Sequence, residues 1–82
     1  MASTDRDSLL ALFNATDGAN WKNNNRWGTD ADLSQWNGVG VNDQGRVVEL
    51  DLRYNKLRGP IPPQLANLGA LNLLDLSANE LI

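Results

Sequence analysis

The chain has 82 residues, of which 41% are hydrophobic and 21% charged, and its net charge is −3. These totals fit one small globular domain and, without a basic stripe to neutralise phosphates, argue against nucleic-acid binding. Cysteine and histidine are both absent, which excludes a disulfide framework, a thiolate metal site and a histidine general base. No apolar run approaches the ~20 residues that cross a membrane, and we expect no cofactor.

Residues 4–16 are predicted to form a helix. Thr4 followed by Asp7 fits a capping box, which satisfies backbone N–H groups at the start of a helix. One face carries side chains at helical spacing: Leu9, Leu10, Leu12, Phe13 and Thr16. Gly18 suits the left-handed conformation that ends a helix. The helix should therefore place its apolar face against residues later in the chain.

Residues 19–32 are rich in Asn, Gly, Asp and Thr and are predicted to form a loop. Tryptophan is costly to leave in water, so Trp21, Trp27 and the later Trp36 are expected to pack in the core. Each ring N–H should donate to a loop carbonyl. Binding of a ligand on these rings is the less favoured interpretation.

Two strands are predicted to follow the loop, at about 38–41 and 46–51. They flank Asn42-Asp43-Gln44-Gly45, a turn signal, and should pair as an antiparallel hairpin.

A repeated pattern occupies the rest of the chain. Val47–Leu57 and Leu71–Leu81 match at five positions 24 residues apart and share the pattern L-x-x-L-x-L-x-x-N-x-L, with valine at the first position of the first copy. A fixed period in this range is typical of a leucine-rich solenoid, in which each repeat contributes one short strand. Asn55 and Asn79 should satisfy backbone groups where the chain bends. Between the copies, three prolines favour an extended leg and a short helical turn at about 63–67.

The segment Leu57–Leu68 completes the pattern L-x-G-x-I-P-x-x-L-x-x-L, which resembles the plant-type leucine-rich repeat of receptor-kinase ectodomains and their bacterial and algal relatives. Residues 33–41, L-S-Q-W-N-G-V-G-V, and residues 9–21 resemble the N-terminal cap of that family. Ser34 and Val41 occupy positions where the family usually carries a disulfide pair, so this cap would hold by packing.

The resemblance implies an α+β fold: a leucine-rich repeat solenoid fragment with an N-terminal helix and an antiparallel β-hairpin cap. We predict three units, which are the cap at 1–46, a first repeat at 47–70 and a truncated second repeat at 71–82.

Partner binding is expected on the side chains between the strand leucines, on the concave face that the resembled family uses. The candidates are Glu49, Asp51, Arg53, Tyr54, Leu73, Asp75 and Ser77, with Ala78 beside them. Asp51 and Asp75 should align in adjacent repeats and repel each other unless Arg53 or a partner cation neutralises them. Tyr54 and Leu73 are the favoured anchors.

We expect a non-catalytic module that recognises a protein or peptide, because no spacing pairs a serine with a base. One alternative is self-association, for instance as a homodimer, through an uncapped C-terminal end around Leu74, Leu76 and Leu81. Another is the ligand-binding part of a receptor or of a GTPase-type multidomain protein.

Three smaller expectations concern acids, glycosylation and compartment. The acid pairs Asp5 with Asp7 and Asp30 with Asp32 lack the spacing of a calcium loop and are expected to be solvated. Asn14-Ala15-Thr16 is a glycosylation sequon that matters only in a secreted chain and also fits a plain helix end. Missing cysteines and a missing leader favour the cytoplasm; a chain whose leader was trimmed would be secreted or part of an ectodomain.

Overall fold

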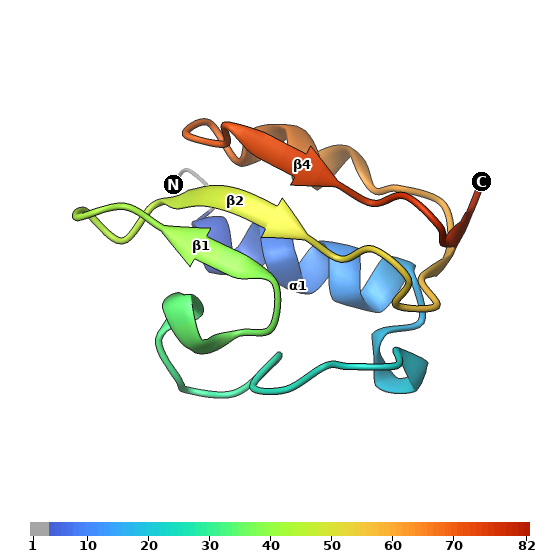
Figure 1. Ribbon diagram of the computed structural model, residues 1–82. Coiled ribbons are helices and arrows are strands. Elements are labelled where there is room, and N and C mark those ends of the chain that lie inside the picture. The colour runs from blue at the N-terminus through green and yellow to red at the C-terminus, as the bar shows by residue number, and fades with distance from the viewer. Residues whose placement is uncertain (1–3) are drawn as a thin grey trace.

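The computed structural model describes residues 4–82 and places one helix behind a small sheet (Figure 1). The elements are α1 (Asp5–Ala15), β1 (Val39–Val41), β2 (Val47–Asp51), β3 (Arg58–Gly59), β4 (Leu73–Asp75) and β5 (Glu80–Leu81), with 3-10 turns η1 (Gly18–Asn20), η2 (Leu33–Gln35) and η3 (Pro63–Asn67). The predicted helix and the helical turn at 63–67 are confirmed. Residues 1–3 of the predicted N-terminal unit lie outside the described part. No helix within residues 4–82 is long and apolar enough to cross a membrane.

Helix α1 begins at the predicted capping box. The Thr4 hydroxyl accepts from the Asp7 N–H at 3.1 Å, and the Asp7 carboxylate accepts from the Thr4 N–H at 3.3 Å. At the other end the prediction for Gly18 is wrong, because Asp17 takes the left-handed conformation with φ of 61°. Gly18 is required for a different reason, since a side chain there would overlap the ring of Phe13.

Strands β1, β2 and β4 form one sheet in that order, and β3 and β5 form a separate parallel pair. The predicted antiparallel pairing of residues 38–41 with 46–51 is present as β1 with β2. Strands β2 and β4 pair in parallel and align Glu49 with Leu73, Leu50 with Leu74 and Asp51 with Asp75. Each of these partners is 24 residues from the other, so the period of the sequence becomes the register of the sheet.

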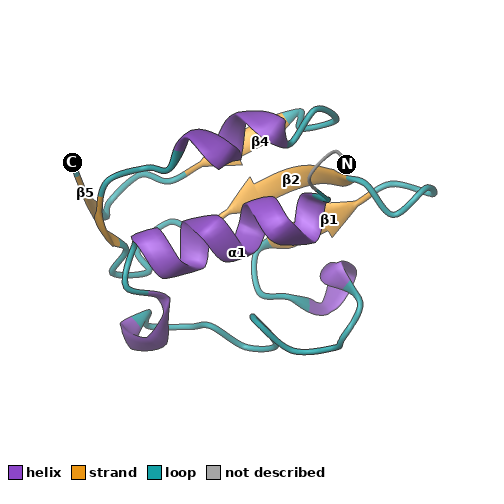
Figure 2. Cartoon of the chain, turned by 180° about the vertical axis from the view of Figure 1, so that it is seen from behind, coloured by secondary structure: helices purple, strands orange, loops and turns teal. Residues whose placement is uncertain are grey.

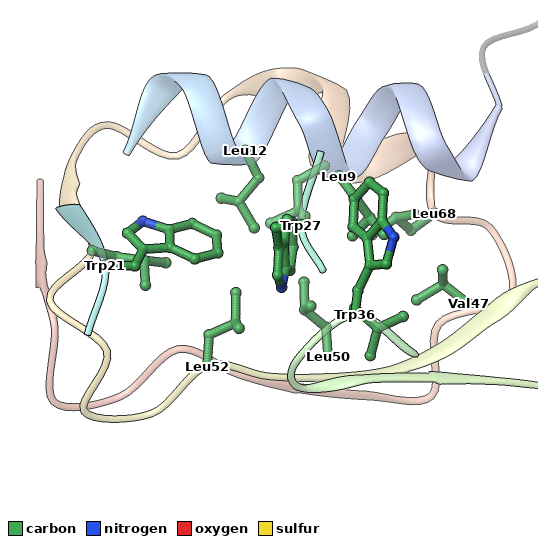
Figure 3. Close-up of a cluster of buried hydrophobic side chains, with 12 residues drawn as sticks. Leu9, Leu12, Trp21, Trp27, Trp36, Val47, Leu50, Leu52 and Leu68 are labelled. Carbon is green, nitrogen blue, oxygen red and sulfur yellow. The ribbon is translucent and has the colours of Figure 1, made fainter. Parts of the chain in front are cut away.

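The core lies between α1 and the sheet, and the three tryptophans fill it (Figure 3). Trp27 is central, with ring centroids of Trp21 and Trp36 at 4.7 and 5.1 Å. The predicted ring N–H bonds are all present: Trp21 to the carbonyl of Thr16 at 3.0 Å, Trp27 to that of Asn37 at 2.9 Å and Trp36 to that of Ala31 at 3.2 Å. The long loop is thereby fixed by packing and hydrogen bonds.

The side chains of Asn55 and Asn79 each bond backbone groups earlier in the chain. The Asn79 carbonyl oxygen accepts from the N–H groups of Asn55 and Leu57, both at 3.0 Å, and its amide donates to the carbonyl of Leu52 at 2.8 Å. The Asn55 side chain likewise accepts from the Asn23 N–H at 2.7 Å and donates to its carbonyl at 2.9 Å. The predicted role is confirmed for Asn79, whose amide also donates to the carbonyls of Leu76 and Ser77 at its own bend, at 2.9 and 3.1 Å. For Asn55 the prediction is wrong, because its side chain bonds the loop before the sheet instead.

Asp5 joins the start of α1 to the start of β2. Its carboxylate accepts from the guanidinium of Arg46 at 2.9 and 3.2 Å and from the backbone N–H of Val47 at 2.9 Å. The Asp5 residue is 8% exposed, so the expectation that it is solvated is wrong. Burial alone would raise the pKa of Asp5, but the hydrogen bonds from Arg46 and Val47 and the charge of Arg46 outweigh it, and the net pKa is lowered.

Candidate functional site

The candidate binding residues lie on the sheet face opposite the buried leucines. Side chains alternate along a strand, so Leu50 and Leu52 enter the core while Glu49 and Asp51 point away from it. In β4 the partners Leu73 and Asp75 face the same way as Glu49 and Asp51, while Leu74 faces the other way and is still 46% exposed. The same face is free of α1 and η3, which pack side by side behind the sheet (Figure 2). The seven candidates are together called the ridge below: Glu49, Asp51, Arg53, Tyr54, Leu73, Asp75 and Ser77.

Arg53 neutralises the two aspartates at the centre of the ridge. Asp51 and Asp75 are directly paired neighbours on β2 and β4. The Arg53 guanidinium bonds both carboxylate oxygens of Asp51 at 3.0 and 3.1 Å and lies 3.6 Å from Asp75. The predicted repulsion is therefore relieved within the chain, without a partner cation. The hydrogen bond and charge of Asp51, with the charge of Asp75, raise the pKa of Arg53.

Ser77 belongs to the same cluster. Its hydroxyl and its backbone N–H both donate to one carboxylate oxygen of Asp75, at 2.6 and 3.0 Å. These two bonds, and then the charge of Arg53, lower the pKa of Asp75. Asp75 therefore keeps its negative charge to a lower pH than an ordinary aspartate does.

Glu49 and Leu73 form the other end of the ridge. They are paired across β2 and β4, and Glu49 is also paired with Gly40 of β1. Leu73 is 47% exposed, which is a large apolar surface for a residue in a sheet. Gly40 has no side chain, so this end of the ridge presents a carboxylate beside an exposed leucine.

Tyr54 is 71% exposed and follows Arg53 where the chain leaves β2, and its backbone N–H donates to the carbonyl of Ser77 at 3.3 Å. Its φ of 53° is a left-handed conformation that costs a bulky residue free energy. Ala78, at the equivalent position of the second repeat, has φ of 57°, so the bend itself imposes this conformation. The exposed ring of Tyr54 therefore contributes little to the stability of the fold.

A surface hollow lies between Tyr54 and the long loop, and we did not predict it. Its loop side is lined by Lys22, Asn23, Asn24, Asn25 and Asn37, and its floor includes Gly38. Gly38 has φ of 81°, and a side chain there would overlap the carbonyl of Asp51. The run of three asparagines was the available sequence signal. Such a run is typical of an ordinary loop. Nothing in the local sequence indicates that the Asn55 side chain bonds the backbone of Asn23.

Acidic groups elsewhere do not assemble into a cation site. Asp30 and Asp32 are both exposed, as expected. Within residues 4–82 no three side chains of the metal-binding types come together.

The chain is similar to plant receptor-like proteins over most of its length. No protein-family model matches it. It is 40% identical to the LRR receptor-like serine/threonine-protein kinase FEI 2 over 96% of the chain and 38% identical to the leucine-rich repeat receptor-like protein kinase PXC1 over 99%. It is 35% identical to receptor-like protein 47 over 93% of the chain. All three are from Arabidopsis thaliana, and the chain spans only 14%, 12% and 10% of their lengths. With the 24-residue register of its strands, this similarity makes the chain a plant-type leucine-rich repeat protein.

Proposed function

We propose that the chain is a non-catalytic recognition module that binds a protein or peptide on the ridge. In this proposal residues 1–46 cap a leucine-rich solenoid, with the β1–β2 hairpin closing its first edge. Residues 47–70 are the first repeat and residues 71–82 begin the second. Support comes from the parallel register of β2 with β4 and from the antiparallel strand β1, which covers the edge of β2 that faces away from β4.

The observation that carries the proposal is the unburied ridge itself. It offers two apolar contacts, Tyr54 and Leu73, beside three carboxylates and a single guanidinium, that of Arg53. The ridge is therefore net negative, with Arg53 already engaged by Asp51. Such a surface fits an extended segment that combines basic with apolar or aromatic residues. Aromatic anchors would supply most of the affinity and charges would steer the encounter.

Panning random displayed peptides on the immobilised full chain tests this proposal. We expect enrichment of basic and apolar peptides whose affinity falls at least tenfold, about 1.4 kcal/mol, in Tyr54→Ala and Leu73→Ser. The matched control is Leu74→Ser, because Leu74 is 46% exposed but points to the other face of the same strand. Titration calorimetry measures the affinities. Peptides that lose affinity in Leu74→Ser and keep it in the ridge variants would place binding elsewhere and end the proposal.

The relatives bear on the parent protein and its compartment. Their names describe receptor-like proteins and receptor-like kinases, which favours the receptor alternative over a GTPase-type protein. We therefore propose that the ridge belongs to the ligand-binding ectodomain of a receptor-like protein. The relatives lend no support to the expectation of a cytoplasmic protein.

The second candidate function is self-association through the C-terminal edge. An apolar groove runs between η3 and β4, and Leu74 lines it with Ile61, Pro62, Pro63, Leu65, Ala66, Leu68 and Leu71. None of these residues is charged, so two copies can meet there in a two-fold contact without burying a charge. Ile82, at 95% exposed, adds apolar surface at this end.

Sedimentation velocity over a range of concentrations measures this association. We expect a monomer–dimer equilibrium that Leu74→Lys shifts fully to monomer. Leu73→Lys is the control, since the two leucines are adjacent and similarly exposed but face opposite ways. A wild-type chain that stays monomeric at the highest concentration, or loses its dimer in Leu73→Lys, refutes the second candidate.

A further inference from the structure

The sequon Asn14-Ala15-Thr16 lies where α1 ends, and its two key residues have opposite environments. Asn14 is exposed on the last turn of the helix. Thr16 is completely buried, and its hydroxyl donates to the carbonyl of Leu12 at 2.6 Å. The Thr16 carbonyl accepts from the ring N–H of Trp21 at 3.0 Å and from the Arg58 N–H at 3.1 Å. The fold thus explains the threonine but gives no packing reason for the asparagine.

We propose that Asn14 is the acceptor of an N-linked oligosaccharide, attached before the chain folds. The Asn14 side-chain nitrogen forms a bond to the first sugar of a lipid-diphosphate-linked oligosaccharide. The sugar–phosphate bond breaks, the lipid diphosphate leaves with the bonding electrons, and the proton lost by the amide passes to the leaving diphosphate or to solvent. This inference rests on the proposed ectodomain function, since such transfer takes place in the secretory pathway.

The timing follows from the burial of Thr16. The acceptor motif requires a hydroxyl residue two positions after the asparagine, so the modifying enzyme must reach that hydroxyl. In the folded chain this group has no exposed surface and is held by Leu12. Attachment therefore competes with folding of α1 onto the sheet, and the folded protein is not a substrate.

A sugar chain at Asn14 is compatible with binding at the ridge. Helix α1 lies behind the sheet (Figure 2). By the alternation of side chains along a strand, Glu49 and Leu73 point to the face away from α1. Asn14 is also exposed in the folded state, so an attached sugar extends into solvent without displacing a packed group. The modification would then lie on the helix side of the sheet, opposite the face that carries Leu73.

The test translates the full chain behind a cleavable secretory leader in the presence of endoplasmic-reticulum microsomes. Chains protected from added protease are compared before and after treatment with a peptide N-glycosidase. We expect one sugar chain on wild type and on Thr16→Ser, which keeps the motif. We expect none on Asn14→Gln, whose exposed substitution leaves the fold intact, or on Thr16→Val, which keeps the side-chain shape.

A second arm opens microsomes with detergent and offers them the purified chain, either folded or held unfolded in mild denaturant. We expect modification of the unfolded chain only. Protected wild-type chains without a sugar overturn the acceptor site, and equal modification of the folded chain overturns the timing. Peptide binding at the ridge is measured separately on unmodified protein. Loss of the proposed function would appear as absent peptide binding, and loss of the acceptor site as absent sugar attachment.

Discussion

Replacing Trp27 with alanine is expected to lower the free energy of unfolding by roughly 3–5 kcal/mol, the usual cost of removing a large core aromatic side chain. The ring of Trp27 is 6.0 Å from that of Phe13 and packs against both other tryptophans. Its removal opens a cavity beneath the long loop and leaves the Asn37 carbonyl without the ring N–H at 2.9 Å. In a domain of this size each kcal/mol shifts Tm by roughly 4–8 °C.

Thermal unfolding followed by circular dichroism measures this loss. Trp27→Phe is the control, because it keeps most of the apolar volume and removes the N–H donor. We expect a smaller drop in Tm for Trp27→Phe than for Trp27→Ala. If the two variants unfold at the same temperature, the hydrogen bond to Asn37 outweighs packing. If neither differs from wild type, the tryptophan cluster does not hold the loop.

Replacing Asp5 with alanine is expected to cost about 2–3 kcal/mol. The variant leaves the N–H of the fully buried Val47 without its acceptor and removes two charge-assisted bonds to Arg46. The Arg46 side chain is 47% exposed, so water can solvate it again, which places the cost below that of breaking a fully buried ion pair. Urea unfolding followed by tryptophan fluorescence measures the change. Asp30→Ala, at an exposed position, should change stability by less than about 0.5 kcal/mol.

The same contact gives the protein an acid-sensitive component of stability. The pKa of Asp5 is lowered from 3.8 in the folded state, so its stabilisation is fully present above the unfolded value. As the pH falls below about 4 and through the lowered folded pKa, the stabilisation is lost. Asp5→Asn cannot gain or lose this proton and should show a shallower fall in stability over that window. Identical acid profiles for wild type and Asp5→Asn would mean that other carboxylates cause the loss.

The local elements and the strand register could be predicted from the sequence because their signals are local or repeated. The capping box of Thr4 and Asp7 marks the start of α1. The 24-residue period alone is enough to place Glu49 beside Leu73. It also places Asp51 beside Asp75, and charge then implies the bridging role of Arg53. The exposure of the ridge follows from the alternation of side chains along a strand.

The contacts between the N-terminal segment and the repeats could not be predicted in the same way. Asp5 and Arg46 are 41 residues apart, and no periodicity links them. A signal was nevertheless present, since Asp5 is one helical turn before Leu9 and therefore lies on the apolar face of α1. The hollow beside Tyr54 depends on how the loop docks, which composition does not specify. The role predicted for Gly18 is wrong because a glycine is needed there to make room for the ring of Phe13.

The hydrogen bonds of Asn79 determine which part of the chain a substitution there would affect. It belongs to the second repeat, yet its carbonyl oxygen serves the N–H groups of Asn55 and Leu57 and its amide serves the carbonyl of Leu52. The bend after β2 is thus completed by a side chain from the second copy of the pattern. Substitution of Asn79 would therefore loosen the bend after β2, which belongs to the first copy of the pattern. The stability of this bend therefore depends on a residue that is made 24 positions later in the chain.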